Sequence, residues 1–255
     1  MKIDGVEVVI EGSGLPIVLL HGWPDTHHVW DGQVAALKGQ YRCIRFTLPG
    51  FERGSARRSH TLDEIVALIH KVVEQVAGGP AMLLLHDWGS FFGYQYALRH
   101  PAQVRRIVSV DIGDAGSPRH VAELSAPAKA FTVGYQVWLA LAWRVGGGVG
   151  DGMARWMARR AGARSDFDRI TANMGWPYDQ QWFRGGFHKA QLFRPSCPML
   201  FIYGTRKAFM FHSSAWVAEV GARPGSAVLA LPTSHWVMCD APAEFNAAVI
   251  DWLAR

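Results

Sequence analysis

Short apolar runs, rich in β-branched residues, alternate with longer amphipathic segments along most of the chain. The short runs predict strands at Val6–Ile10, Ile17–Leu20, Tyr41–Phe46, Ala81–His86, Val104–Asp111, Met199–Tyr203 and Ala227–Leu231. Helical spacing predicts helices at Val29–Leu37, from Thr61 onward, and at Ser90–His100, Ser213–Gly221 and Pro242–Leu253. Strands and helices in this alternation predict a mostly parallel sheet with helices on both faces.

The helix that begins after Thr61 has the clearest end signals. Thr61 with Glu64 three residues later is typical of a capping box. The sequence Gly78-Gly79-Pro80 predicts where this helix ends, because glycine ends helices and proline cannot continue them.

The alternation of strands and helices stops between residues 113 and 195. This stretch contains no convincing strand, and its helical segments are interrupted at Gly146-Gly147-Gly148 and at Trp176-Pro177. We therefore predict one α/β core, formed by residues 1–112 and 196–255, with a helical cap inserted at residues 113–195.

The composition is that of a folded domain without a nucleic-acid module. The chain has 255 residues, of which 49% are hydrophobic and only 18% charged, so long disordered segments are not expected. Eleven tryptophans and thirteen phenylalanines indicate a thick core or an apolar ligand cavity. The net charge of +5 comes from basic residues such as Arg155, Arg159, Arg160 and Arg164, which we interpret as a solvated surface rather than a nucleic-acid site.

Cysteine usage and hydropathy favour a cytoplasmic location. Cys43, Cys197 and Cys239 are far apart and form no metal-binding pair, which is typical of a reduced protein without disulfides. The first residues lack the apolar core of a signal peptide, and the longest apolar stretch, 128–145, is interrupted by charged residues. We expect no membrane partner, and a homodimer is compatible with the sequence.

The most informative segment is His86-Asp87-Trp88-Gly89, where a buried strand leads directly into a helix. This is the setting of a nucleophile elbow, with Asp87 in the position that serine usually occupies. A carboxylate suits attack on saturated carbon, because the resulting ester can be hydrolysed at its carbonyl group. The alternative is that Asp87 only caps the following helix. Leu85 departs from the small residue that is usual before the nucleophile.

Two further segments fall where an elbow of this kind needs them. His21-Gly22-Trp23-Pro24 follows the second strand, so the backbone N–H groups of Trp23 and Trp88 would form an oxyanion hole. His235 follows the last strand, from which it could act as general base on water. We also assign His21 to the candidate substrate-binding residues.

These motifs resemble the α/β-hydrolase family, and within it the branch of epoxide hydrolases and haloalkane dehalogenases. His-Asp-Trp-Gly at 86–89 and His-Gly-Trp-Pro at 21–24 carry the resemblance, which extends over nearly the whole chain. The resemblance implies a triad acid, but the segment 204–209, where many members place it, contains none. Asp111 matches the position that other members use, and Asp114 is the second candidate.

The resemblance also implies a reaction. Epoxide opening needs an acid, and Tyr135 and Tyr178 in the predicted cap are candidates for it. The preferred hypothesis is an epoxide hydrolase that acts on a small apolar substrate and water, without a cofactor or metal ion. The alternatives are a haloalkane dehalogenase, although the Asn typical of one group is replaced by Trp23, an esterase using Asp87 only as a base, and a catalytically silent binding protein.

Overall fold

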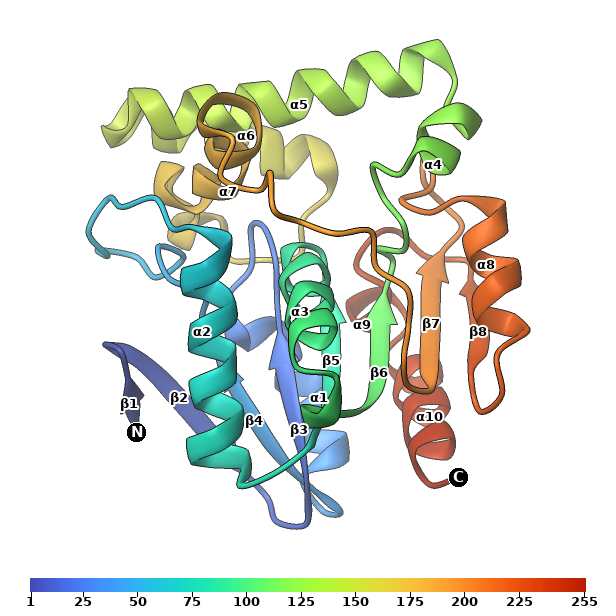
Figure 1. Ribbon diagram of the computed structural model, residues 1–255. Coiled ribbons are helices and arrows are strands. Elements are labelled where there is room, and N and C mark those ends of the chain that lie inside the picture. The colour runs from blue at the N-terminus through green and yellow to red at the C-terminus, as the bar shows by residue number, and fades with distance from the viewer.

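The computed structural model describes residues 1–255, and an eight-stranded sheet forms its centre (Figure 1). The strand order is β1-β2-β4-β3-β5-β6-β7-β8. The strands are β1 (Lys2–Ile3), β2 (Val6–Glu11), β3 (Leu15–Leu20), β4 (Tyr41–Phe46), β5 (Ala81–His86), β6 (Val104–Val110), β7 (Met199–Gly204) and β8 (Ala227–Leu231). The strands β3 to β8 are parallel, whereas β2 is antiparallel to β4 and β1 is antiparallel to β2. The predicted class, a mostly parallel sheet, is confirmed.

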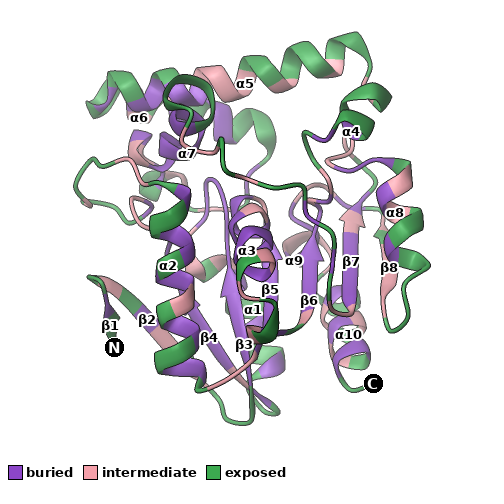
Figure 2. Ribbon diagram, in the orientation of Figure 1, coloured by how far each residue is buried: buried purple, intermediate pink, exposed green.

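Helices cover both faces of the sheet. One face carries α1 (Asp31–Leu37) and α10 (Pro242–Leu253), and the other carries α2 (Leu62–Val72), α3 (Trp88–Arg99) and α8 (Ser214–Gly221) (Figure 1). All six residues of β5 are buried between these layers (Figure 2). A strand covered on both faces needs apolar residues on both, which explains the uninterrupted apolar run Ala81–Leu85 before His86.

The predicted ends of the helix after Thr61 are confirmed. The Thr61 hydroxyl accepts a hydrogen bond from the Glu64 N–H at 3.2 Å, and the Glu64 carboxylate accepts one from the Thr61 N–H at 2.8 Å. The helix extends through a π turn, Val73–Ala77, and ends at Gly78, whose φ of 70° is left-handed. Other short turns of 3-10 or π type lie at His27–Trp30, Pro101–Gln103, Phe167–Arg169, Ala172–Gly175 and Gln180–Arg184.

Between β6 and β7 the chain forms only helices and turns, and these lie above the carboxyl ends of the strands (Figure 1). The helices are α4 (Pro118–Glu123), α5 (Ala126–Val145), α6 (Gly147–Ala161) and α7 (Trp176–Asp179). α5 ends and α6 begins at Gly146. The Trp176 indole N–H donates to the Pro49 carbonyl at 2.8 Å, which fixes α7 to the core.

The sequence pattern does not predict every short element of the structure. The two-residue strand β1 and the four-residue helix α9 (Val237–Asp240) were not predicted, because neither is long enough to show a periodicity. The helix α3 begins at Trp88, two residues before its predicted start. None of the helices is long and apolar enough to cross a membrane.

Candidate active site

Asp87 lies at the sharp turn between β5 and α3. Its backbone has φ 51° and ψ −124°, an unfavourable conformation for a residue with a side chain. Its carboxylate does not cap α3, so the interpretation of Asp87 as a helix cap is wrong. Instead, Asp87 Oδ1 accepts a hydrogen bond from the Trp23 backbone N–H at 2.6 Å. The turn therefore presents the carboxylate to the loop that follows β3.

Two glycines allow the loop after β3 and the elbow to approach so closely. A Cβ on Gly22 would overlap the Asp87 carboxylate and the Trp88 nitrogen. A Cβ on Gly89 would overlap the backbone carbonyl groups of Leu20 and His21. The backbones are thus in direct contact, which is how the Trp23 N–H reaches Asp87.

The unusual Leu85 is accommodated by a glycine on the neighbouring helix. Gly93, one turn into α3, faces Leu85, and a Cβ there would lie 2.6 Å from Leu85 Cδ2. The larger Leu85 side chain therefore fits beneath the elbow because Gly93, facing it on α3, has no side chain.

His235 connects two carboxylates. Its Nδ1 is 2.5 Å from Asp111 Oδ2, and its Nε2 is 3.6 Å from Asp87 Oδ2. Asp111 follows β6 and is fully buried, and its φ of 68° turns the side chain toward β7, where the Gly204 N–H donates to Asp111 Oδ1 at 3.0 Å. The structure therefore brings Asp87, His235 and Asp111 into one linear contact series.

Asp114, the second candidate for the triad acid, has other partners. Its carboxylate accepts hydrogen bonds from the Ser213 N–H at 2.7 Å, the Ser213 hydroxyl at 2.8 Å and the Ser117 hydroxyl at 2.7 Å. Asp114 thus joins the turn after β6 to the start of α8, and Asp111 is the carboxylate that contacts His235.

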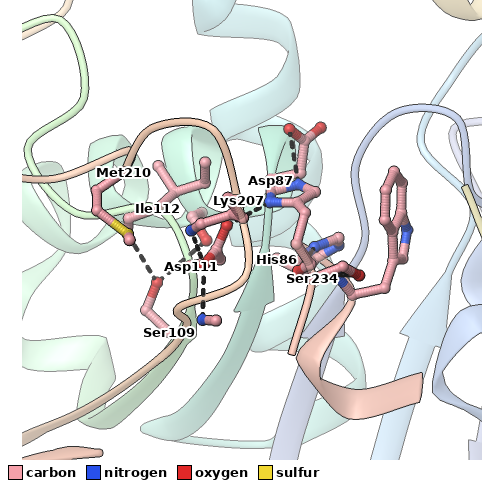
Figure 3. Close-up of polar contacts among 12 residues, drawn as sticks. His86, Asp87, Ser109, Asp111, Ile112, Lys207, Met210 and Ser234 are labelled. Atoms are coloured by element: carbon pink, nitrogen blue, oxygen red, sulfur yellow. Dashed lines mark hydrogen bonds and ion pairs between the residues drawn. The ribbon is translucent and has the colours of Figure 1, made fainter. Parts of the chain in front are cut away.

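Lys207 is a site residue that sequence reasoning missed. Its ammonium group forms an ion pair with Asp111, and its side chain is only 8% exposed (Figure 3). Lys207 belongs to the segment after β7 in which the sequence shows no acid. The only signal in the sequence is a lysine within a mostly apolar loop, which does not identify its partner 96 residues away.

The charges of the site depend on these contacts. Burial opposes ionisation of Asp87 and Asp111, but His235 together with other donors and charges, among them Lys207 at Asp111, keeps the pKa of both carboxyl groups below its ordinary value. Burial likewise opposes a charge on His235, but the hydrogen bond to Asp111 and the proximity of Asp87 raise its pKa to about 9. In the resting site, His235 is therefore an imidazolium between two carboxylates.

Tyr135 on α5 and Tyr178 on α7 converge near Trp23 and Trp88, on the two loops that meet at Asp87. Their ring centroids are 6.1 Å apart, and the Tyr178 ring is 5.2 Å from Trp88 and 6.2 Å from Trp23. Burial raises the pKa of both phenols, and the charge of Asp87 raises it further. Both hydroxyl groups therefore keep their protons and can donate them.

His21 has a different position from the two tyrosines. Its ring is fully buried, its Nε2 accepts a hydrogen bond from the Leu48 N–H at 2.9 Å, and its Nδ1 is 3.0 Å from the Gly22 carbonyl. Burial lowers its pKa to about 4, so the ring is neutral. This arrangement holds the loop that contains Trp23.

His86 packs against His235. Its Nε2 is 3.2 Å from the His235 carbonyl oxygen, and the two rings are 4.4 Å apart. Burial lowers the pKa of His86 to about 3, so it too is neutral. No group of three or more His, Cys, Asp or Glu side chains is arranged to hold a metal ion.

Comparisons with known proteins agree with this architecture. The sequence profile described as alpha/beta hydrolase fold matches residues 16–242. The crystal structure of Bacillus megaterium epoxide hydrolase with an inhibitor superimposes with a TM-score of 0.75 at 18% identity, covering 100% of this chain and 99% of that chain. At that identity, the likeness concerns the fold.

Two curated relatives from Mycobacterium tuberculosis match shorter segments. "Probable oxidoreductase EphD" is 33% identical over 129 residues, which are 46% of this chain and 21% of the relative. "Epoxide hydrolase B" is 29% identical over 108 residues, which are 41% of this chain and 30% of the relative. The matched segments thus span less than a third of these relatives. The profile match over most of the chain shows that the protein belongs to the α/β-hydrolase family.

Proposed function

We propose that the protein is an epoxide hydrolase with Asp87 as its nucleophile. The observation that carries this proposal is the placement of two protonated tyrosines, Tyr135 and Tyr178, near a carboxylate on an elbow turn. An epoxide needs this combination, because its carbon must be attacked while its oxygen receives a proton. The names of the epoxide hydrolase relatives support the same class of reaction.

The first half-reaction uses the two oxygens of Asp87 differently. Oδ1 is held by the Trp23 N–H at 2.6 Å, while Oδ2 faces His235 Nε2 at 3.6 Å. Oδ2 attacks an epoxide carbon, a new C–O bond forms, and the ring C–O bond breaks. The released alkoxide takes a proton from Tyr178 or Tyr135, which leaves an alkyl ester on Asp87.

The second half-reaction hydrolyses this ester. Once Asp87 is esterified, its negative charge is lost, so the pKa of His235 falls. The imidazolium returns its proton to the tyrosinate, and the neutral imidazole then takes a proton from water. The hydroxide attacks Asp87 Cγ, and the N–H groups of Trp23 and Trp88 stabilise the negative charge on Oδ1. The acyl–oxygen bond then breaks, and the departing oxygen takes the proton from His235. The diol leaves with the oxygen that attacked the epoxide, the water oxygen remains in Asp87, and the proton of the Asp87 carboxyl group passes to His235, which restores the resting charges.

A haloalkane dehalogenase is the second candidate, and one observation favours it. The Trp23 indole nitrogen is buried without a hydrogen-bond partner. Such an N–H group beside the nucleophile could stabilise a departing halide, for which no proton donor is needed. The attack by Asp87 and the hydrolysis assisted by His235 would be the same in both reactions.

The experiment that tests the proposal compares epoxides with haloalkanes as substrates. We expect wild type to release diols from terminal or aryl epoxides and Asp87→Ala to release none. The His235→Gln variant should accumulate an alkyl adduct on the peptide containing Asp87, detected by mass spectrometry. Halide release without diol formation would replace the proposal by the dehalogenase. The folded enzyme turning over neither class would favour a binding protein.

A single turnover in ¹⁸O-labelled water separates the covalent route from simple base catalysis. The covalent route leaves the label in Asp87 and gives unlabelled diol in the first turnover. If Asp87 acted only as a base on water, the label would appear in the diol instead.

A further inference from the structure

We propose that Lys207 is a positioning residue of the triad, which orients the Asp111 carboxylate toward His235 and neutralises part of its negative charge. This inference rests on the proposed function, because it assigns a role within that reaction. Lys207 comes from the loop after β7, where a triad acid would be expected from the resemblance and none exists.

The two carboxylate oxygens of Asp111 have different hydrogen-bond partners. Oδ2 faces His235 Nδ1 at 2.5 Å, whereas Oδ1 accepts a hydrogen bond from the Gly204 N–H at 3.0 Å. Oδ1 also accepts a hydrogen bond from the Lys207 ammonium group (Figure 3). Because three donors hold the carboxylate from two sides, it cannot rotate without losing a charged hydrogen bond. Lys207 thus fixes the direction in which Asp111 presents Oδ2.

Because the ion pair between Lys207 and Asp111 is buried, its two charges interact more strongly than those of an ion pair at the surface. Asp111 is fully buried and the Lys207 side chain is 8% exposed, so solvent screens neither charge effectively. The ammonium group also lies 5.3 Å from the centre of the Phe211 ring. A lysine is rarely buried unless it is paired, and removing one partner of such a pair leaves the other charge uncompensated.

The charged groups around His235 have opposite effects on the pKa of its imidazole. Asp87 and Asp111 favour the imidazolium, whereas the Lys207 charge disfavours it. The neighbouring imidazoles, His86 from β5 and His212 from the loop after β7, have pKa values lowered chiefly by burial. Asp114 is held by Ser213, at the start of α8. Lys207 is therefore the one cation within this group besides His235 itself.

This balance matters in the second half-reaction. When Asp87 is an ester, Asp111, in direct contact, and the buried Asp25, whose pKa responds to the charge of His235, still favour the imidazolium. Lys207 offsets the influence of Asp111. His235 is thereby kept neutral and able to accept a proton from water near neutral pH. Without Lys207, the imidazole would hold its proton to higher pH and the hydrolysis of the ester would slow.

The test measures the two half-reactions separately in Lys207→Met and Lys207→Arg. In Lys207→Met we expect alkylation of Asp87 to keep its rate, while the pH profile of ester hydrolysis shifts upward by about one unit, since nearby charges shift a pKa by about one to three units. At pH 7 the hydrolysis rate would fall about tenfold or more, and the alkyl-enzyme would accumulate. Lys207→Arg, which keeps the charge, should restore most of the profile.

Lys129→Met is the matched control, because Lys129 is exposed on α5, away from the triad. It should leave both rates unchanged. A Lys207→Met enzyme that folds and retains the wild-type pH profile of hydrolysis would overturn the inference. Equal slowing of alkylation and hydrolysis in both Lys207 variants, without a shift of the profile, would also overturn it, since that pattern indicates a merely structural role.

A second readout does not depend on epoxide turnover. NMR titration of the His235 imidazole in the resting protein should give a higher midpoint in Lys207→Met than in wild type, and Lys207→Arg should return it. If Lys207→Met does not fold, the same titration on Lys207→Gln decides the matter. An unshifted midpoint overturns the role of Lys207, whereas an inactive wild type with a shifted midpoint overturns only the proposed function.

Discussion

The hydroxyl of Tyr135 accepts a hydrogen bond from Gln136 Nε2 at 3.2 Å, so its own proton is not used in that contact. Tyr178 lies between the Trp23 and Trp88 rings, and its side chain is 3% exposed. Both phenols are therefore held in position by neighbours that leave their protons free for a substrate. In the proposed reaction, these two hydroxyl groups distinguish an epoxide, which needs a proton on its oxygen, from a halide, which does not.

Replacing either tyrosine should affect epoxides selectively. For Tyr178→Phe and Tyr135→Phe we expect kcat/KM on epoxides to fall by about 100-fold each, which is within the contribution usual for a general acid. The rate of halide release from haloalkanes should not fall, because a halide leaves without a proton. Steady-state kinetics on both substrate classes measure the effect.

Tyr41→Phe is the control for this comparison, since Tyr41 lies on β4 outside the site and is buried. It should change neither activity. If epoxide turnover survives in the double variant Tyr135→Phe and Tyr178→Phe, the two phenols are not the acid and the proposed reaction needs another donor.

The sequence predicted which single residues meet in the site only where a local pattern marks their positions. Asp87 and His235 each follow an apolar run of strand length, so their positions could be predicted from the adjoining segments. The choice between Asp111 and Asp114 could not be predicted from the sequence, because it depends on which of the two carboxylates turns toward β7. Lys207 could not be predicted either, since its partner is 96 residues away and no periodicity links them.

The elbow works as one element built from β5, the turn and α3. Leu85 and Gly93 are complementary in size, which sets how closely α3 packs on the sheet beneath Asp87. The sequence alone shows only an unusual Leu85. Its glycine partner lies eight residues on and is recognisable only when the strand and the helix are packed together.

Gly93→Ala should therefore destabilise the protein, although alanine ordinarily favours a helix. The added methyl group would overlap Leu85, and overpacking of this kind typically costs about 1–3 kcal/mol. Combining it with Leu85→Ala should recover part of that loss, so the effects of the two substitutions would not be additive. Urea denaturation of the two single variants and the double variant measures the coupling.

Gly134→Ala on α5 provides the control for helix propensity. Nothing lies within 4 Å of a Cβ at Gly134, so this substitution should stabilise the protein by up to about 1 kcal/mol. A Gly93→Ala variant as stable as Gly134→Ala would show that α3 and β5 are not closely fitted at this point.

At the scale of the molecule, charge is divided unevenly between core and cap. Residues 113–195 contain eleven Lys and Arg against six Asp and Glu, whereas the rest of the chain has fifteen of each. Of the basic residues expected to form a solvated surface, Arg159 and Arg160 are exposed, whereas Arg155 makes contacts within the fold. Arg144 and Arg184 both pair with the buried Asp179, at 2.6 and 2.5 Å, and Arg155 donates to the carbonyl groups of Phe167 and Ile170. These arginines hold the cap segments to one another.

Buried titratable groups make the stability of the whole fold depend on pH. His21 and His86 have pKa values of about 4 and about 3 against an ordinary value of 6.5, chiefly because burial disfavours their charged forms. Their contribution to stability is therefore complete above about pH 6.5 and is lost as the pH falls toward these values. Asp25 acts in the opposite direction, since burial raises its pKa to about 6, so its contribution is present below its ordinary pKa of 3.8 and is lost as the pH rises through 6.

On the alkaline side, His235 determines the trend. Because its pKa in the folded protein is about 9, above its ordinary value of 6.5, its contribution to stability is complete below 6.5 and is lost as the pH rises through 9. The free energy of unfolding should therefore be highest near neutral pH and fall on both sides.

The acid side of this profile can be tested by removing one histidine. Urea unfolding of wild type between pH 4 and 6.5 should show stability falling with pH, because two histidines take up protons on unfolding while Asp25 offsets about one. His86→Gln should remove about 1.4 kcal/mol per pH unit from that slope, the value for one proton. His188→Gln, at an exposed position on the cap, should leave the slope unchanged. An identical slope in wild type and His86→Gln would mean that His86 does not remain neutral in the folded protein, and that the ring beside His235 carries a charge.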